Sequence, residues 1–547
     1  MAYRSFPVVT FSAPGYLPVD GLQVGTLPWL LALFRSVWFP AWLFAGWRGE
    51  RPRGRPAWPA AVLMVLVLLR WEHEGMSRRA CVKQALTDLR WRAALGVPIG
   101  TRPPSERTLR DFERFLRQRH PSTGVRRYLL LHEHVVRQCC SQGNLAKTAV
   151  YAMDSTPQWC YGAVLDTVRL LGDGLRALGR QWARESHRSL SEVAAQWDLP
   201  LLLHKSTKGA YPVDWRCPEA RTAVLSDLVR HVLQATQWVR RHVESVRSSM
   251  RKSLLRKCRH LLRVITNDLE TDEQGDLEVA QRVAADRLIS LTDPQARHGH
   301  KTQHHRFNGF KVHLLGDLVS GLLVSLSVTP GNQHDATQTN RLIQRAQALC
   351  QQLEQVLADT AYGGARQRYL VKALYGVELV SPPPSAAAPR QGRLGRKDIQ
   401  VDFKTGSATC ANGITTTDRR LIWSSDHGVR VPLLQWDKRD CDACPLQAQC
   451  RGPSRQGLRV LLHPYEQELR AARAAWQTPQ VQQRYRLRAQ AERLVRLVTG
   501  HGGRRARQWG LGAAQLQAHA IATTWNLGML AKMVAVSPDR PAAQTVC

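Results

Sequence analysis

The chain has 547 residues and a formal net charge of +34, because 77 lysines and arginines outnumber 43 aspartates and glutamates. Its length predicts three or four units of roughly 150 residues each. The charge is spread along the chain and not confined to a tail, and the 12 cysteines are too scattered for the disulfide framework of a secreted protein. Genomic base composition explains part of the arginine excess but not the deficit of acids. Nucleic acid, bound through its phosphates, is therefore the expected partner.

Two apolar stretches near the N-terminus are long enough to be compared with a membrane helix. Leu27–Trp47 is interrupted by Arg35 and Pro40, and Pro59–Leu69 is too short to span a bilayer. No basic-then-apolar signal precedes them. We therefore expect buried helices, no contact with a membrane, and a reducing, cytoplasmic location.

Residues 1–145 are predicted to form a helical N-terminal domain that binds DNA. Within it, Pro104–Leu116 has the pattern of a helix with an apolar stripe beside a basic face, and Ser105 or Thr108 is suited to cap its start. The spacing fits an ordinary surface helix as well as a helix in a DNA groove.

Two short apolar runs each end in an aspartate. Ala149–Met153 precedes Asp154, and Leu353–Ala358 precedes Asp359. We interpret both runs as buried strands that present a carboxylate at their exposed ends, and we expect Pro157 to stop sheet pairing shortly after the first. An aspartate that closes a strand is more often a turn residue than a ligand, so each run alone is a weak signal.

A third carboxylate belongs to Glu492. Tyr485, Arg488 and Glu492 are spaced i, i+3 and i+7, so we predict that they share one face of a helix. Two strands and a helix would then supply three carboxylates, the hard oxygen ligands that Mg²⁺ or Mn²⁺ accepts. Such a set suits two metal ions that act on a phosphodiester, one activating the attacking hydroxyl and the other stabilising the leaving oxygen.

The segments around these carboxylates predict a mixed α/β core. Residues 161–292 are basic and helical in pattern and separate the first strand from the rest. A β-hairpin, a helix and a further strand are then expected at residues 307–328, 335–350 and 377–380. The proline-rich segment Pro382–Pro389 has the composition of a linker.

These residues resemble the DDE transposases of bacterial insertion sequences, and among them the superfamily typified by insertion sequence four and its eleven-eighty-two-like group. The signature of that superfamily is Tyr, two residues, Arg, three residues, Glu, six residues and Lys. Tyr485, Arg488 and Glu492 match it in register, and Thr499 stands where the lysine is expected. Further matching segments cover nearly the whole chain: Asp154–Thr156, Asp293–Arg297 with Lys301, Gly309–His313, Thr329–Asn332 with His334 and Asp335, Asp359 with Tyr362 and Gly363, and Asn526–Leu527.

The resemblance implies an α/β fold: an RNase H-like mixed sheet core with a helical N-terminal domain, interrupted by a helical insertion and by a β-rich, cysteine-containing insertion. It also implies that Asp154, Asp359 and Glu492 are the catalytic residues and bind two Mg²⁺ or Mn²⁺ ions. The expected units are residues 1–145, the N-terminal domain; 146–382, the first part of the core with the helical insertion at 161–292; 383–465, the second insertion; and 466–535, the last part of the core.

By the same resemblance, Tyr485 and Arg488 hold DNA phosphate near the cleavage site. Arg496, one turn after Glu492, is placed to supply the charge that Thr499 lacks. Further DNA contacts are expected from Lys301, Arg306 and Lys311, with His304 and His305 in the same basic loop. Asp335 lies near the predicted core, and we interpret it as a helix cap.

The second insertion contains four cysteines, Cys410, Cys441, Cys444 and Cys450. Cys-x2-Cys with two further cysteines fits a tetrahedral structural zinc site. Free or merely buried thiols fit the same spacing, and a disulfide is the remaining alternative.

The function that the resemblance implies is transposition. A homodimer would bind the inverted-repeat ends of its element on double-stranded DNA, cleave the strands, and join the freed 3′-hydroxyls to a target at the nucleoid. Two alternatives remain: a non-catalytic DNA-binding regulator of transposase descent, and a metal-dependent nuclease without strand joining. The nuclease shares every residue with the transposase and differs only in its products.

Overall fold

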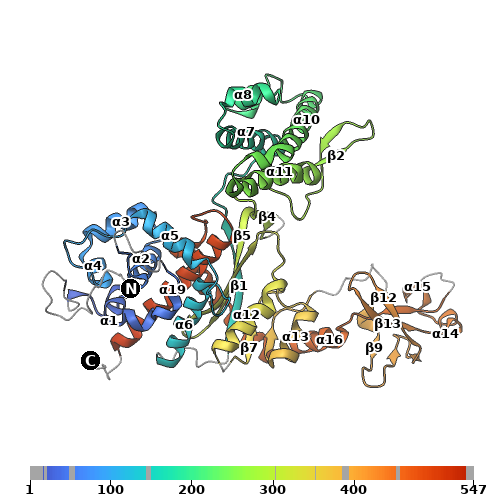
Figure 1. The fold of residues 1–547 in the computed structure, drawn as a ribbon. Coiled ribbons are helices and arrows are strands. Elements are labelled where there is room, and N and C mark those ends of the chain that lie inside the picture. The colour runs from blue at the N-terminus through green and yellow to red at the C-terminus, as the bar shows by residue number, and fades with distance from the viewer. Residues whose placement is uncertain are drawn as a thin grey trace.

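A central β-sheet carries three groups of elements (Figure 1). The computed structural model describes residues 17, 21–47, 56–142, 150–301, 304–350, 353–384, 394–450 and 456–536. The N-terminal helices and α19 (Leu511–Val536) lie on one side of the sheet, the helices of residues 167–268 stand above it, and strands β9 to β14 form a separate lobe at the far right (Figure 1).

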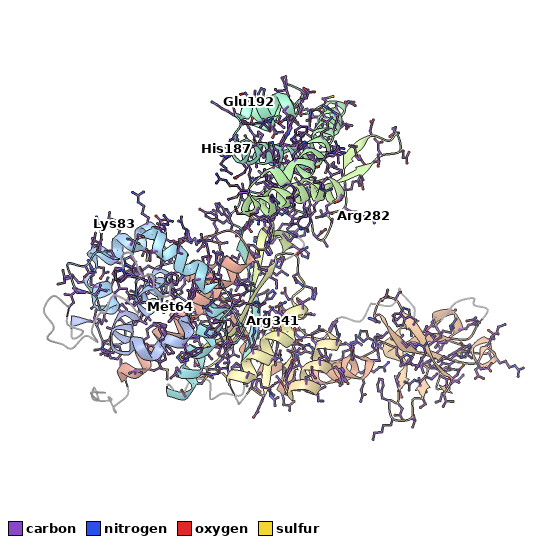
Figure 2. All side chains as sticks on the ribbon, in the orientation of Figure 1. Met64, Lys83, His187, Glu192, Arg282 and Arg341 are labelled. Atoms are coloured by element: carbon purple, nitrogen blue, oxygen red, sulfur yellow. The ribbon has the colours of Figure 1, made fainter. Side chains whose placement is uncertain are left out.

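The N-terminal region is helical, as predicted, through the residues that the structure describes. Its elements are α1 (Leu27–Trp38), the short 3₁₀ helix at Ala41–Phe44, α2 (Ala60–Glu72), α3 (Arg78–Thr87), α4 (Leu89–Leu95), α5 (Glu106–Leu116) and α6 (Arg127–Gln142). The Ser105 hydroxyl caps α5 by accepting the Thr108 N–H at 3.1 Å. Met64 is fully buried inside this lobe, whereas Lys83 projects from its surface (Figure 2). No helix among the described residues is long and apolar enough to cross a membrane.

Six strands form the central sheet: β1 (Val150–Trp159), β4 (Arg297–His300), β5 (Arg306–Asp317), β6 (Leu323–Pro330), β7 (Gln355–Leu357) and β8 (Glu378–Val380). β1 lies between β5, which is antiparallel to it, and β7, which is parallel to it. β8 extends the sheet parallel to β7, while β4 and β6 both pair with β5. The sheet is mixed, and the predicted hairpin is confirmed as β5 and β6.

β1 continues past Asp154, and the prediction that Pro157 ends its pairing is wrong. The N–H of Trp159 donates to the carbonyl of Arg504 on the edge of β1 that faces away from β5. Because N–H groups alternate between the two edges of a strand, the N–H that Pro157 lacks belongs to that same edge. The pairing with β7 has already ended at Ala152, so no ladder bond is lost.

Helices cover both faces of the sheet. The predicted helix at 335–350 is confirmed as α12 (Ala336–Leu349), and α13 (Ala365–Tyr375) follows between β7 and β8. The segment with the predicted third carboxylate comprises α17 (Pro479–Arg486), the 3₁₀ turn η6 (Leu487–Gln490), α18 (Ala491–Val498) and the π turn η7 (Thr499–Gly503). Ala491, Leu494 and Val498 bury one face of α18 in a cluster with residues of β1, β5 and β6.

α19 joins the N-terminal helices to the sheet. It packs against α1, α2 and α6 on one side and against β6 on another. The Asn526 side chain donates to the carbonyl of Leu323 and accepts its N–H, at 2.9 and 3.0 Å. One continuous buried cluster therefore contains Leu63 and Phe112 of the N-terminal helices together with Val324 of β6.

Two lobes have buried clusters of their own. The first contains α7 (Thr167–Glu185), α8 (Leu190–Gln196), α9 (Thr207–Ala210), α10 (Pro218–His242), α11 (Ser248–Asp268) and the hairpin β2 (Leu269–Thr271) and β3 (Leu277–Val279). The second contains β9 (Gln400–Val401), β10 (Ala408–Thr409), β11 (Thr415–Thr416), β12 (Arg419–Ser424), β13 (Val429–Gln435), α14 (Lys438–Asp442), α15 (Gln447–Cys450) and β14 (Arg459–Leu461), and α16 (Glu466–Trp476) leads back to the core. Of the predicted linker Pro382–Pro389, residues 385–389 lie outside the described residues.

Candidate active site

Asp154 and Asp359 come from two neighbouring parallel strands or their ends. In the β1–β7 register Ala152 is opposite Leu357; Asp154 follows two residues later within β1, and Asp359 lies two residues after the end of β7. The side chains of Asp154 and Asp359 are 16% and 38% exposed. β7 ends before Asp359, so the edge of β1 opens at this point and both carboxylates reach solvent.

Arg488 connects the two carboxylates. Its Nη2 lies 3.3 Å from Asp154 Oδ2 and 4.0 Å from Asp359 Oδ2. The remaining aspartate oxygens accept backbone N–H groups, Asp154 Oδ1 from Ser155 at 2.7 Å and Asp359 Oδ1 from Ala361 at 3.0 Å. The Nε of Arg488 is buried and has no hydrogen-bond partner among the described residues, so this guanidinium retains a free donor at the site.

Burial dominates the electrostatics of this pair. Desolvation raises the pKa of Asp154 and of Asp359 above the usual value, and Arg488 offsets only part of the effect. The pKa of nearby Tyr485 is also raised, first by desolvation; Arg488 lowers it, and the charges of Asp359 and Asp154 raise it. One arginine is thus insufficient compensation for two adjacent carboxylates.

Asp335 contacts Ser155, the residue that follows Asp154, and the interpretation of the Asp335 side chain as a helix cap is wrong. It occupies the position before α12, but its side chain makes no capping hydrogen bond. Its carboxylate instead pairs with Lys311 Nζ at 2.7 Å and accepts the Ser155 hydroxyl at 2.9 Å. Lys311, predicted to contact DNA, is 15% exposed and is engaged in this ion pair.

Sequence reasoning also missed a buried polar chain below the aspartates. His313 Nδ1 lies 2.9 Å from the Tyr362 hydroxyl, and His313 Nε2 lies 2.8 Å from Thr329 Oγ1. Desolvation lowers the pKa of His313 to about 4, so the ring is neutral and fixed between two hydroxyls. Polar residues at alternate positions of a buried strand were the available signal, since His313 and Lys311 share one face of β5.

The side chain of Glu492 is directed to solvent in the structure, and the segment from Tyr485 to Glu492 is not one regular α-helix. Its side chain is 71% exposed and lies 3.9 Å from Arg496. Tyr485 belongs to α17 and Arg488 to the 3₁₀ turn η6, which precedes α18. A 3₁₀ turn rotates each residue about 20° further than an α-helix, so Glu492 is displaced around the axis from Arg488.

The other predicted DNA contacts lie on the surface around this opening. Lys301, His304, His305 and Arg306 are exposed at the start of β5, and Arg496 is 81% exposed on α18. Tyr485 is partly buried and packs its ring against Trp476 with centroids 4.8 Å apart. Thr499 opens the π turn after α18, where its hydroxyl donates to the carbonyl of Arg496.

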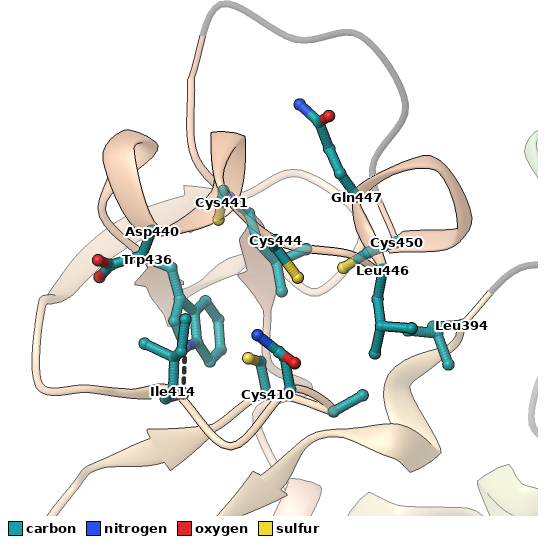
Figure 3. A pocket seen from close by; sticks show the side chains of 13 residues that line it. Leu394, Cys410, Ile414, Trp436, Asp440, Cys441, Cys444, Leu446, Gln447 and Cys450 are labelled. Carbon is teal, nitrogen blue, oxygen red and sulfur yellow. Dashed lines mark hydrogen bonds between the residues drawn. The ribbon is translucent and has the colours of Figure 1, made fainter.

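The four predicted zinc ligands line one pocket in the second lobe (Figure 3). Cys410 follows β10, Cys441 lies in α14, Cys444 lies between α14 and α15, and Cys450 ends α15. None of these four cysteines forms a disulfide in the structure. Within the described parts of the chain, no three His, Cys, Asp or Glu side chains are already arranged to hold a metal ion, at this pocket or at the aspartate pair.

Two family models match the chain. A transposase DDE domain matches residues 281–527, and a transposase domain of the type DUF772 matches residues 43–114. The first match contains Asp359 and Glu492, whereas Asp154 lies outside both. A DDE domain implies an RNase H-like fold, which the mixed sheet with helices on both faces accommodates. No curated protein and no solved structure matched the chain. Both matches are to transposase domains, and together they indicate a DDE transposase family.

Proposed function

We propose that this protein is a DNA transposase that binds the inverted-repeat ends of its element, cleaves the strands and transfers them to a target. The observation that carries the proposal is the pair Asp154 and Asp359, which come from two neighbouring strands or their ends at an open sheet edge, with Arg488 above them. Two hard carboxylates in contact with solvent, and with raised pKa values, favour the binding of a divalent cation.

Asp154 and Asp359 are the proposed ligands of Mg²⁺ or Mn²⁺, and Glu492 is the proposed third ligand. Bound there, two ions would supply activation of a hydroxyl or water and stabilisation of the leaving oxygen. Glu492 is exposed, whereas its neighbours Ala491 and Leu494 are buried, so its side chain must turn towards the aspartates for the set to be complete. DNA binding is the step that would draw it in.

Arg488 and Tyr485 are the proposed phosphate contacts nearest the aspartates. When a cation neutralises the carboxylates, the Arg488 guanidinium is released from them and can donate to a phosphate oxygen, for which its Nε–H is already free of partners among the described residues. Lys301, Arg306 and Arg496 are exposed cations that would hold the strand on either side. We also propose a homodimer on DNA, because two element ends have to be held together.

The position of Glu492 favours a second candidate function. Since Glu492 pairs with Arg496 in solvent and not with the aspartates, a non-catalytic DNA-binding regulator of transposase descent is consistent with this geometry. Such a protein would bind the element ends without cutting them.

The test is a cleavage assay on a DNA fragment that carries the gene with its native flanks, in Mg²⁺ or Mn²⁺. We expect cuts at the inverted-repeat boundaries, and a loss on the order of 10³-fold or more for Asp359→Asn and for Glu492→Gln. Glu273→Gln, an exposed carboxylate in the β2–β3 turn, is the matched control and is expected to cut like the wild type.

Each other outcome identifies an alternative. Binding of the ends without cuts under either metal supports the regulator. Cuts without joined products in the presence of target DNA support the metal-dependent nuclease. Full cleavage by Glu492→Gln would remove Glu492 from the site and leave the two aspartates as its acidic residues.

A further inference from the structure

The lobe of β9 to β14 has a small hydrophobic core for its length. Its buried apolar residues, among those that the structure describes, are Ile399, Ala408, Val431, Leu433, Leu434, Trp436, Val460 and Leu462. The lobe consists of two three-stranded sheets, β11-β10-β9 and β12-β13-β14, with strands of two to seven residues. Units with so little apolar burial are commonly stabilised by disulfides or by a structural metal ion.

Four cysteines come from the segments that connect strands within each of the two sheets. Cys410 lies in the turn that joins β10 to β11, where its carbonyl accepts the Gly413 N–H and its N–H donates to Ile414. Cys441 lies in α14, Cys450 ends α15, and Cys444 lies between these two short helices, which follow β13. The side chains of all four line the same pocket, together with Trp436 and Leu458 (Figure 3).

The chemistry of the pocket suits a soft metal ion. The Cys441 sulfur accepts the N–H of Leu458 at 3.2 Å. Four sulfur donors, with two of them spaced Cys-x2-Cys, are the set that Zn²⁺ takes in tetrahedral structural sites. The sulfurs line the pocket without yet forming a finished coordination shell, so metal binding requires rotation about the single Cα–Cβ bond of individual cysteines.

We propose that Cys410, Cys441, Cys444 and Cys450 bind one structural Zn²⁺ ion that holds the β9–β11 sheet to the β12–β14 sheet. Binding releases the protons that remain on the thiols and forms four zinc–sulfur bonds, with no change of oxidation state. The ion is separate from the proposed catalytic Mg²⁺ or Mn²⁺, because it has soft sulfur ligands and lies in another lobe.

The experiment measures the zinc content of the purified full-length protein by mass spectrometry of the metal. We expect about one Zn²⁺ per chain in the wild type and a loss of at least about ten-fold in Cys444→Ser. Cys217→Ser is the matched control and is expected to retain the zinc, because Cys217 lies in the helical lobe and contacts Glu219. Asp154→Asn with Asp359→Asn is also expected to retain it, which separates this site from the proposed active site.

A second variant covers the case in which Cys444→Ser fails to fold. Cys450→His replaces one zinc ligand with another and is expected to remain soluble with about one Zn²⁺ per chain. Reconstitution of the metal-free wild type with Co²⁺ should also produce the visible absorption of a tetrahedral thiolate complex. A zinc-free wild type without this absorption would overturn the proposal, as would full zinc content in both Cys444→Ser and Cys410→Ser.

Discussion

The burial of Asp154 and Asp359 has an electrostatic cost in the metal-free protein. Burial raises the pKa of both carboxyl groups above the unfolded value of about 3.9. The native state therefore binds these protons more tightly than the unfolded chain does. Stability falls as the pH rises through the interval between the unfolded and the native pKa values, and it stays lower above that interval.

Removing one of these charges should therefore stabilise the metal-free protein. For Asp154→Asn at pH 7 we expect a thermal midpoint about 1–3 °C above that of the wild type. The difference should shrink as the pH approaches about 4, because the wild-type carboxyl is then protonated as well. Mg²⁺ should raise the midpoint of the wild type but not that of the variant. Differential scanning calorimetry with and without the metal measures both effects, and a destabilised variant at pH 7 would contradict the argument.

We expect Lys311 to contribute to stability and Arg306 to contribute to DNA binding. Lys311 forms a largely buried ion pair with Asp335, so Lys311→Met should leave that carboxylate uncompensated and cost about 3 kcal/mol of stability. Arg306 is exposed, so Arg306→Met should preserve stability but weaken DNA binding and lower the salt slope by about 1. Chemical unfolding and fluorescence anisotropy at several salt concentrations test the pair. The reverse assignment of the two effects would refute it.

At the scale of the element, Gly309 of β5 lies opposite Trp159, the last residue of β1. Gly309 has φ +151°, and a Cβ there would lie 2.2 Å from the carbonyl oxygen of Gln158 and 2.5 Å from the Cys160 nitrogen. Gly309→Ala should therefore separate the two strands and cost about 3 kcal/mol or more. Gly528→Ala is the matched control, since a Cβ at Gly528 in α19 meets nothing within 4 Å, and it should be neutral or slightly stabilising. Urea unfolding of the three proteins compares them, and equal midpoints would contradict the expected contact.

The elements around the site were largely predictable because their signals are local. Apolar runs that end at turn residues predicted the β5–β6 hairpin and α12, and both are present. The continuation of β1 through Pro157 was not predictable from the sequence. Pro157 lacks its N–H on the edge of β1 that faces β7, and that edge has lost its partner strand by then because β7 ends at Leu357. The 3₁₀ turn at Leu487–Gln490 was equally hidden, since its residues carry no distinct pattern.

The contacts of Asp335 beside the site were the least predictable part, because the residues that make them are distant in sequence. Asp335 meets Ser155 across 180 residues and Lys311 across 24 residues, so no local spacing reveals the contact. The i, i+3, i+7 pattern found Tyr485 and Arg488 correctly near the aspartates but assumed a regular helix as far as Glu492. Local spacing thus identified candidates, while the strand register determined which of them lie together.

At the scale of the whole molecule, the four groups of elements differ in how they share their cores. The N-terminal helices and the sheet contribute to one buried cluster, and α19 lies between them. The helical lobe and the β9–β14 lobe have separate clusters. At the base of the second lobe, the two connecting segments lie close together, since Arg473 Nη2 donates to the carbonyl of Pro384 at 3.4 Å. A short linker can therefore replace this lobe.

Two deletions test this difference in cooperativity. Replacing residues 394–462 with a short Gly-Ser linker should leave the main thermal transition within about 3 °C of the wild type, because no part of the shared cluster is removed. Deleting residues 1–142 should abolish that transition, because it exposes Val324, Ile521 and Leu527, which are now fully buried. Near-ultraviolet circular dichroism and calorimetry follow both proteins. If the chain without residues 1–142 still unfolds cooperatively at the wild-type midpoint, the N-terminal helices form an independent domain. If that chain loses the transition while the chain without residues 394–462 keeps it, the N-terminal helices belong to the same cooperative unit as the sheet.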